Sequence, residues 1–133
     1  MSWQVSDLES SRKLKELGVV QESLFWWVNI PDGIPSDHKY QTGWRLTSGA
    51  STIKMEKCSA FTCAELGVAL PYAYYSFKLH EKSTWSCIPK EMDLLISEGN
   101  TEAQARSLML IYLLEQKLIT VEEVNARLLG VGK

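Results

Sequence analysis

The sequence contains few residues of the kinds that mark secreted or membrane proteins. Its 133 residues include three cysteines, Cys58, Cys63 and Cys87, an odd number without the spacing of a disulfide framework. We therefore expect reduced thiols. The longest uncharged apolar run, residues 108–114, is far shorter than the ~20 residues that span a membrane. The first fifteen residues contain no apolar segment of a signal peptide, so we expect a cytoplasmic protein without a membrane partner.

An excess of positive charge is also absent. Lysine and arginine number 14 against 16 aspartates and glutamates, which gives a formal net charge of −2. Proteins that bind nucleic acid contact phosphates mainly through lysine and arginine. The charge balance therefore argues against nucleic acid as a partner.

Motifs of catalysis or metal binding are missing too. The sequence has neither G-x-S-x-G nor H-E-x-x-H, and the terminal Gly-Val-Gly-Lys lacks the earlier glycine and the final serine or threonine of a P-loop. Cys58 and Cys63 are separated by four residues, but the other zinc-ligand candidates, His38, His80 and Cys87, are scattered. A His80–Cys87 pair would lack a third orienting group. We expect no catalytic residue, metal or cofactor, and interpret the thiols as buried.

Periodicity and capping signals predict an α+β protein. The expected elements are helices over 6–19, 61–71, 101–117 and 120–131 and strands over 22–30, 40–46, 51–55, 72–80, 84–88 and 92–97. The strands 22–30 and 40–46 are expected to form one hairpin, and the strands 72–80 and 84–88 a second. Thr62 with Glu65, and Thr101 with Gln104, have the spacing of a capping box. We predict a single domain over 1–133, in which helices pack on one face of an antiparallel sheet of about four to five strands. Two of the helices are C-terminal.

Aromatic residues are concentrated between residues 24 and 44, and this stretch supplies the candidate site. Alternation in the strand 22–30 places apolar residues on both faces, so we interpret the aromatics mainly as core. The alternative is a groove for a peptide or protein partner, since tryptophan is enriched at binding hot spots. The residues of this candidate partner surface are Trp27, Asp37, His38, Tyr40 and Trp44.

Three segments resemble those of small uncharacterised proteins of tailed bacteriophages and prophages. They are residues 11–28 (SRKLKELGVVQESLFWWV), 61–71 (FTCAELGVALP) and 100–119 (NTEAQARSLMLIYLLEQKLI). The family pattern has K-L-x-E-L-G, T-A-x-E-L and E-A-x-A-R in this order, and Cys63 stands where alanine is commoner. The resemblance implies a bacterial cytoplasmic setting and a phage origin, and it supplies no activity or catalytic residue.

A helix that is apolar on every side needs cover that one sheet does not provide. For residues 101–117 that cover is expected from the first helix, the last helix or a second subunit. We therefore predict a non-catalytic protein that acts through protein contacts, with a homodimer as one form. The alternative is a small ligand-binding protein or enzyme with a cleft near the Asp32–His38 loop, where Asp37, His38 and Tyr40 are the polar groups.

Overall fold

The computed structural model describes residues 5–30, 43–48, 56–70, 74–79, 84–89 and 97–130. Within them the chain forms four helices and two antiparallel sheets, which confirms the α+β class and the two C-terminal helices. The helices are α1 (Leu8–Glu16), α2 (Cys63–Ala69), α3 (Glu102–Glu115) and α4 (Val121–Leu128). The strands are β1 (Phe25–Ile30), β2 (Gly43–Ser48), β3 (Lys57–Ala60), β4 (Tyr74–Leu79), β5 (Thr84–Pro89) and β6 (Ser97–Gly99).

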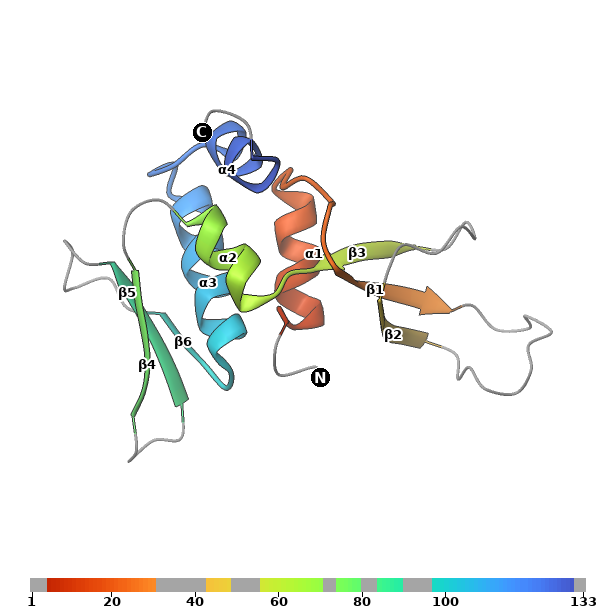
Figure 1. Ribbon diagram of the computed structural model, residues 1–133, viewed down its shortest axis with the longest axis horizontal. Helices are drawn as coiled ribbons and strands as arrows, with labels where there is room; N and C mark the ends of the chain where they lie inside the picture. The colour runs from red at the N-terminus through yellow and green to blue at the C-terminus, as the bar shows by residue number, and fades with distance from the viewer. Residues whose placement is uncertain are drawn as a thin grey trace.

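The strands are divided between two sheets, whereas the sequence predicted one. Their orders are β2-β1-β3 and β4-β5-β6. Helices α1, α2 and α3 lie between the two sheets, and α4 lies across one end of the helices (Figure 1). The helix layer keeps the edges of the two sheets apart, so each predicted hairpin forms its own sheet instead of joining the other.

The first sheet confirms the predicted hairpin and its alternation. Trp26, Val28 and Ile30 are buried, whereas the alternate residues of β1 are half-buried. Strands β2 and β3 both pair antiparallel with β1, one along each of its edges. The predicted strand at 51–55 lies outside the described residues, and the third strand of this sheet is Lys57–Ala60. In the second sheet the third strand is Ser97–Gly99, so most of the predicted strand at 92–97 also lies outside them.

The helix caps follow the predicted signals. Thr62 and Glu65 form the complete capping box of α2, with Phe61 and Leu66 buried on either side of it. At α3 the Thr101 hydroxyl accepts a bond from the Gln104 backbone N–H. The Gln104 side chain, however, accepts from the N–H of Asn100, 2.6 Å away, rather than from the cap residue itself.

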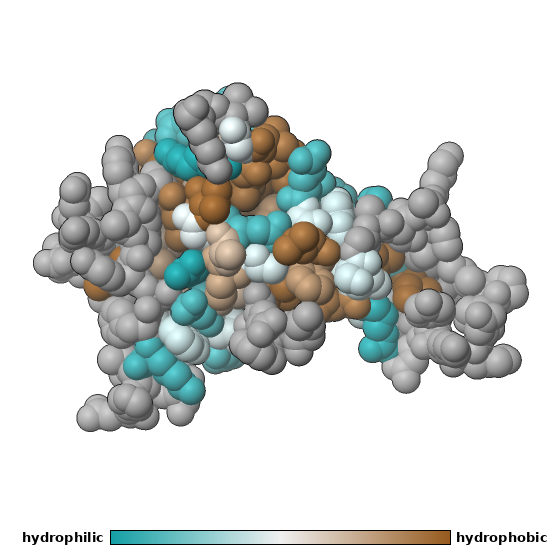
Figure 2. Space-filling view, viewed as in Figure 1, coloured by the Kyte–Doolittle hydropathy of each residue, from teal (hydrophilic) through white to brown (hydrophobic). Residues whose placement is uncertain are grey.

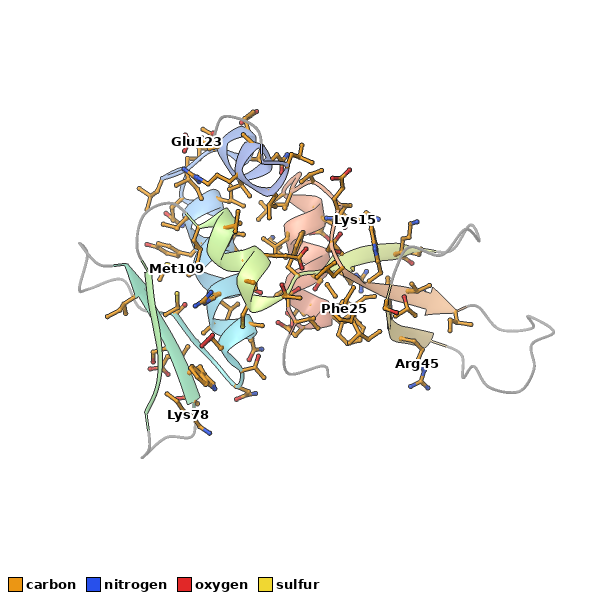
Figure 3. The ribbon with its side chains drawn as sticks, in the orientation of Figure 1. Lys15, Phe25, Arg45, Lys78, Met109 and Glu123 are labelled. Atoms are coloured by element: carbon orange, nitrogen blue, oxygen red, sulfur yellow. The ribbon has the colours of Figure 1, made fainter. Side chains whose placement is uncertain are left out.

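Helix α3 is the centre of the core. Its buried residues are Ala103, Ala105, Ser107, Met109, Leu110, Ile111, Leu113 and Leu114. Helices α1 and α2 and the β4-β5-β6 sheet pack against it, and Figure 3 labels Met109 among the side chains of this layer. The chain therefore provides most of the cover that α3 needs, without a second subunit. Two large apolar side chains of α3 remain outside that cover: Leu108 is 36% exposed and Tyr112 is 41% exposed.

Candidate protein-binding groove

Trp27 and Trp44, two of the predicted site residues, lie on one face of the first sheet. The antiparallel register sets Trp44 opposite Asn29, which shares the face of Trp27. Both tryptophans are half-buried. Asp37, His38 and Tyr40, with the whole Asp32–His38 loop, lie outside the described residues.

Each tryptophan is held by groups of its own chain. The indole Nε1–H of Trp27 donates to the carbonyl oxygen of Ser6 at 2.9 Å. The guanidinium carbon of Arg12 lies 5.5 Å from the ring centroid of Trp44, which is a cation–π distance. These contacts connect the N-terminal segment and α1 to the sheet, so they give both residues a structural role.

A buried network of hydrogen bonds holds the N-terminal end of α1 against the N-terminal end of α2. The Ser6 N–H donates to the Phe61 carbonyl at 2.7 Å, and the Phe61 N–H donates to Ser6 Oγ at 2.9 Å. The hydroxyls of Ser6 and Ser11 are 2.6 Å apart and are both buried. Serines facing a core give little sequence signal, and our sequence analysis missed them.

Helices α1 and α3 run side by side in the same direction (Figure 1). At their N-terminal ends Asp7 and Gln104 line one shallow pocket. Further along, Lys13 Nζ lies 3.3 Å from Glu115 Oε2. This parallel arrangement leaves a groove along the seam between the two helices.

The groove has an apolar floor and a charged rim. Its volume is about 600 Å³. Leu8 from α1 and Leu108 and Ile111 from α3 supply the apolar side chains. The polar and charged lining residues are Asp7, Glu9, Ser10, Arg12, Lys13, Glu16 and Gln104. A floor of this kind can take the apolar face of a polypeptide, while the rim meets its polar edge.

Two further pockets lie near the N-terminal end of α3. A pocket of about 280 Å³ shares Asp7, Leu8 and Gln104 with the groove and reaches Trp27. A further pocket of about 520 Å³ shares Asn100 and Thr101 with that one and reaches Trp85. Trp27 thus lines a pocket next to the groove. Trp44 lines another neighbouring pocket, which shares Arg12 and Glu16 with the groove.

Leu108 and Tyr112 are exposed apolar residues that sequence reasoning missed. Leu108 stands in a continuous apolar run, where its neighbours Met109 and Leu110 are buried. Because α3 is apolar on nearly every side, the pattern alone gives no sign of which side faces solvent. Only the direction from which α1, α2 and the second sheet cover α3 makes Leu108 an outer residue.

The cysteines are poorly suited to nucleophilic chemistry at neutral pH. Burial raises the pKa of Cys58 to about 11, and it does the same for Cys87. Burial also raises the pKa of Cys63 to about 11, with the charge of Glu102 as a smaller contribution. The reactive form of cysteine is the thiolate, and a raised pKa keeps these thiols protonated.

Other chemistry has little support in the described part of the chain. Within it, no group of three or more His, Cys, Asp or Glu residues is placed to hold a metal ion. His80, the base of the candidate pair with Cys87, lies outside the described residues. The described helices include none that is both long enough and apolar enough to cross a membrane.

Fold and groove together define an α+β protein with two small sheets around a helix layer and a grooved helical surface. Comparison with protein-family models, curated proteins and solved structures gives no match to the chain.

Proposed function

We propose that the chain is a non-catalytic protein that acts by binding protein along the α1–α3 groove. The observation that carries the proposal is the exposure of Leu108 and Tyr112, at 36% and 41%. They stand four residues apart, and so on one face, of a helix whose other apolar side chains are mostly buried. Large apolar side chains grouped beside a groove are typical of protein-binding surfaces.

The shape and the rim of the groove favour a polypeptide over a small molecule. Pockets for small molecules enclose most of the ligand and carry few polar groups. Two further pockets near the N-terminal end of α3 reach Trp27 and Trp85, and charged side chains of both signs line the α1 side of the groove. An open surface of this kind can bind the apolar anchor residues of a helix or an extended segment.

We also propose, on the sequence resemblance alone, that the protein is of phage or prophage type and acts in the bacterial cytoplasm. A gene position among tail or packaging genes would support a role in the virion, and a position among early genes a role directed at the host. A gene located among chromosomal metabolic genes, with no phage genes beside it, would contradict the phage origin.

The binding function predicts a specific crosslink at Tyr112. We expect a photoreactive phenylalanine analogue at this position, in the full chain expressed in bacteria, to form one crosslinked band of defined mass on illumination. The same analogue at Glu122, an exposed residue on α4, serves as the control and should give no such band. The measurement is gel mobility followed by mass spectrometry.

A second variant distinguishes specific binding from nonspecific crosslinking to other proteins. Leu108→Glu places a charge at the groove without entering the core, and it should abolish the Tyr112 crosslink. Absence of a band at Tyr112, or a band that persists in the Leu108→Glu variant, would contradict the proposed function.

A further inference from the structure

We infer that the protein bound in the groove presents an aspartate or glutamate side chain to Arg12, next to the apolar residues that contact the groove floor. This inference rests on the proposed function and names the chemistry of its partner. The observations that support it are the position of Arg12, the contacts that hold its side chain, and the charges of the pocket that adjoins the groove.

Arg12 stands where the groove meets a second pocket. This pocket has a volume of about 320 Å³ and is lined by residues of α1 and of the first sheet, among them Trp44. Arg12 and Glu16 line both the groove and this pocket, and both side chains are exposed. A polypeptide that occupies the groove and reaches the pocket therefore passes Arg12 where it crosses α1.

The guanidinium of Arg12 is held without a carboxylate partner. Its central carbon lies 5.5 Å from the ring centroid of Trp44, at a cation–π distance. Glu16 stands four residues further along α1, yet the ion pairs among the described residues include neither Arg12 nor Glu16. The contact with Trp44 restricts the side chain, so binding a carboxylate costs it less conformational entropy. The fork of N–H groups on a guanidinium matches the two oxygens of a carboxylate.

The arginines of α3 and α4 have acceptors within their own chain. Arg106 donates to the carbonyl oxygen of Cys63 at 2.8 Å, and Arg127 donates to that of Ala69 at 3.3 Å. Each also lies within ion-pair distance of a glutamate four residues earlier in its helix, at 3.7 and 3.5 Å. Both therefore contact α2, on the side of the molecule seen in Figure 2, where apolar and hydrophilic side chains are mixed over the helices. Arg12 differs from both because no carboxylate of the described residues pairs with it.

The pocket next to the groove carries a net positive charge. Its lining contains three cations and two carboxylates, which leaves one positive charge; they are Arg12, Lys15, Lys57, Glu16 and Glu56. The Nζ of Lys15 is fixed there, since it donates to the carbonyl oxygen of Lys57 at 2.6 Å. Burial raises the pKa of Cys58 to about 11, and the charges of Lys15 and Arg12 oppose this rise. Both cations thus lie close to the same wall of the pocket.

A single carboxylate suits this pocket better than other charged groups. One negative charge balances the net charge of the lining. A phosphorylated side chain brings about two negative charges, which would face Glu16 and Glu56 as well as the cations. A lysine or arginine of the partner would instead meet like charges at Arg12 and Lys15. Charge complementarity therefore selects an aspartate or a glutamate.

Selection of displayed peptides tests the inference. The full chain is the bait, and the probe is a phage-displayed library of random linear peptides. We expect the wild-type chain to enrich peptides that combine apolar residues with an aspartate or glutamate. Fluorescence anisotropy of an enriched peptide should show a Kd that rises about 3- to 10-fold when the acid is replaced by its amide, because the pair lies at the surface. The Leu108→Glu variant should enrich none of these peptides, since they bind in the groove.

Charge reversal at Arg12 gives the decisive result. The Arg12→Glu variant should enrich peptides that carry lysine or arginine in place of the acid. Lys78→Glu makes the same change of charge at an exposed residue of β4, and this matched control should keep the preference for acids. A merely structural role of Arg12, such as support of Trp44, would weaken binding without reversing the preferred charge. Circular dichroism checks the folding of each variant, and the comparison of acid with amide needs no variant.

The inference is overturned if the enriched peptides show no excess of acids, if Arg12→Glu does not enrich basic peptides, or if Leu108→Glu enriches the same peptides as the wild type. The first two results, with enrichment lost in Leu108→Glu, leave the proposed binding function standing. If the wild-type chain enriches no peptide, the inference is overturned as well, and the Tyr112 crosslink then decides the proposed function independently.

Discussion

The Phe61→Ala variant is expected to lose about 3–5 kcal/mol of unfolding free energy, the range found when a buried phenylalanine is truncated. Phe61 is 1% exposed and is among the largest fully buried side chains of the described residues. It precedes the cap of α2 and packs in the same cluster as Leu14 of α1 and Leu110 of α3. Truncation would leave a cavity where these three helices meet.

Urea denaturation followed by tryptophan fluorescence measures the effect, with Val68→Ala as the matched control. Val68 is 48% exposed on α2, so its truncation should change the unfolding free energy by less than about 0.5 kcal/mol. A loss of 3–5 kcal/mol is a large share of the total of about 5–15 kcal/mol for a domain. Similar midpoints for the two variants would show that Phe61 does not hold the helix layer together.

Leu110→Ala should cost about 2–5 kcal/mol, whereas Leu108→Ala should cost less than about 0.5 kcal/mol. The two leucines stand two residues apart on α3, yet Leu110 is 1% exposed and Leu108 is 36% exposed. Alanine has the higher helix propensity, so propensity does not account for a loss at either position. The difference between the variants measures burial alone.

The same denaturation experiment, run on both leucine variants, separates the core face of α3 from its outer face. It is done at low protein concentration, because any self-association would add apparent stability to the wild type. Equal losses at Leu108 and Leu110 would mean that Leu108 is part of the core, which would contradict the proposed binding surface.

Local structure was predictable where one short signal determines it. Thr62 and Glu65 specify a cap, and Gly18, with a φ of +97°, ends α1 in the left-handed conformation that glycine adopts without strain. The two hairpins followed from alternation. The strand Lys57–Ala60 was missed because its sequence, KCSA, has little β-propensity of its own, and pairing with β1 determines it.

The division into two sheets and the position of the groove were not predictable in the same way. Both depend on how α1 and α2 are placed against α3, and the Ser6–Phe61 hydrogen bonds that fix this placement connect residues 55 positions apart. Among the predicted site residues, Trp27 and Trp44 each line a smaller pocket that shares residues with the groove. Leu108 lies within a continuous apolar run, so the sequence did not distinguish it from its buried neighbours.

Photocrosslinking at Tyr112, in the chain with Leu108 and in the Leu108→Glu variant, tests the central claim most directly, since the claim is that the outer face of α3 binds protein. The account predicts one crosslinked band of defined mass when Leu108 is present and no such band in the Leu108→Glu variant, while circular dichroism shows the same fold for both. A band that persists in the variant would contradict the account.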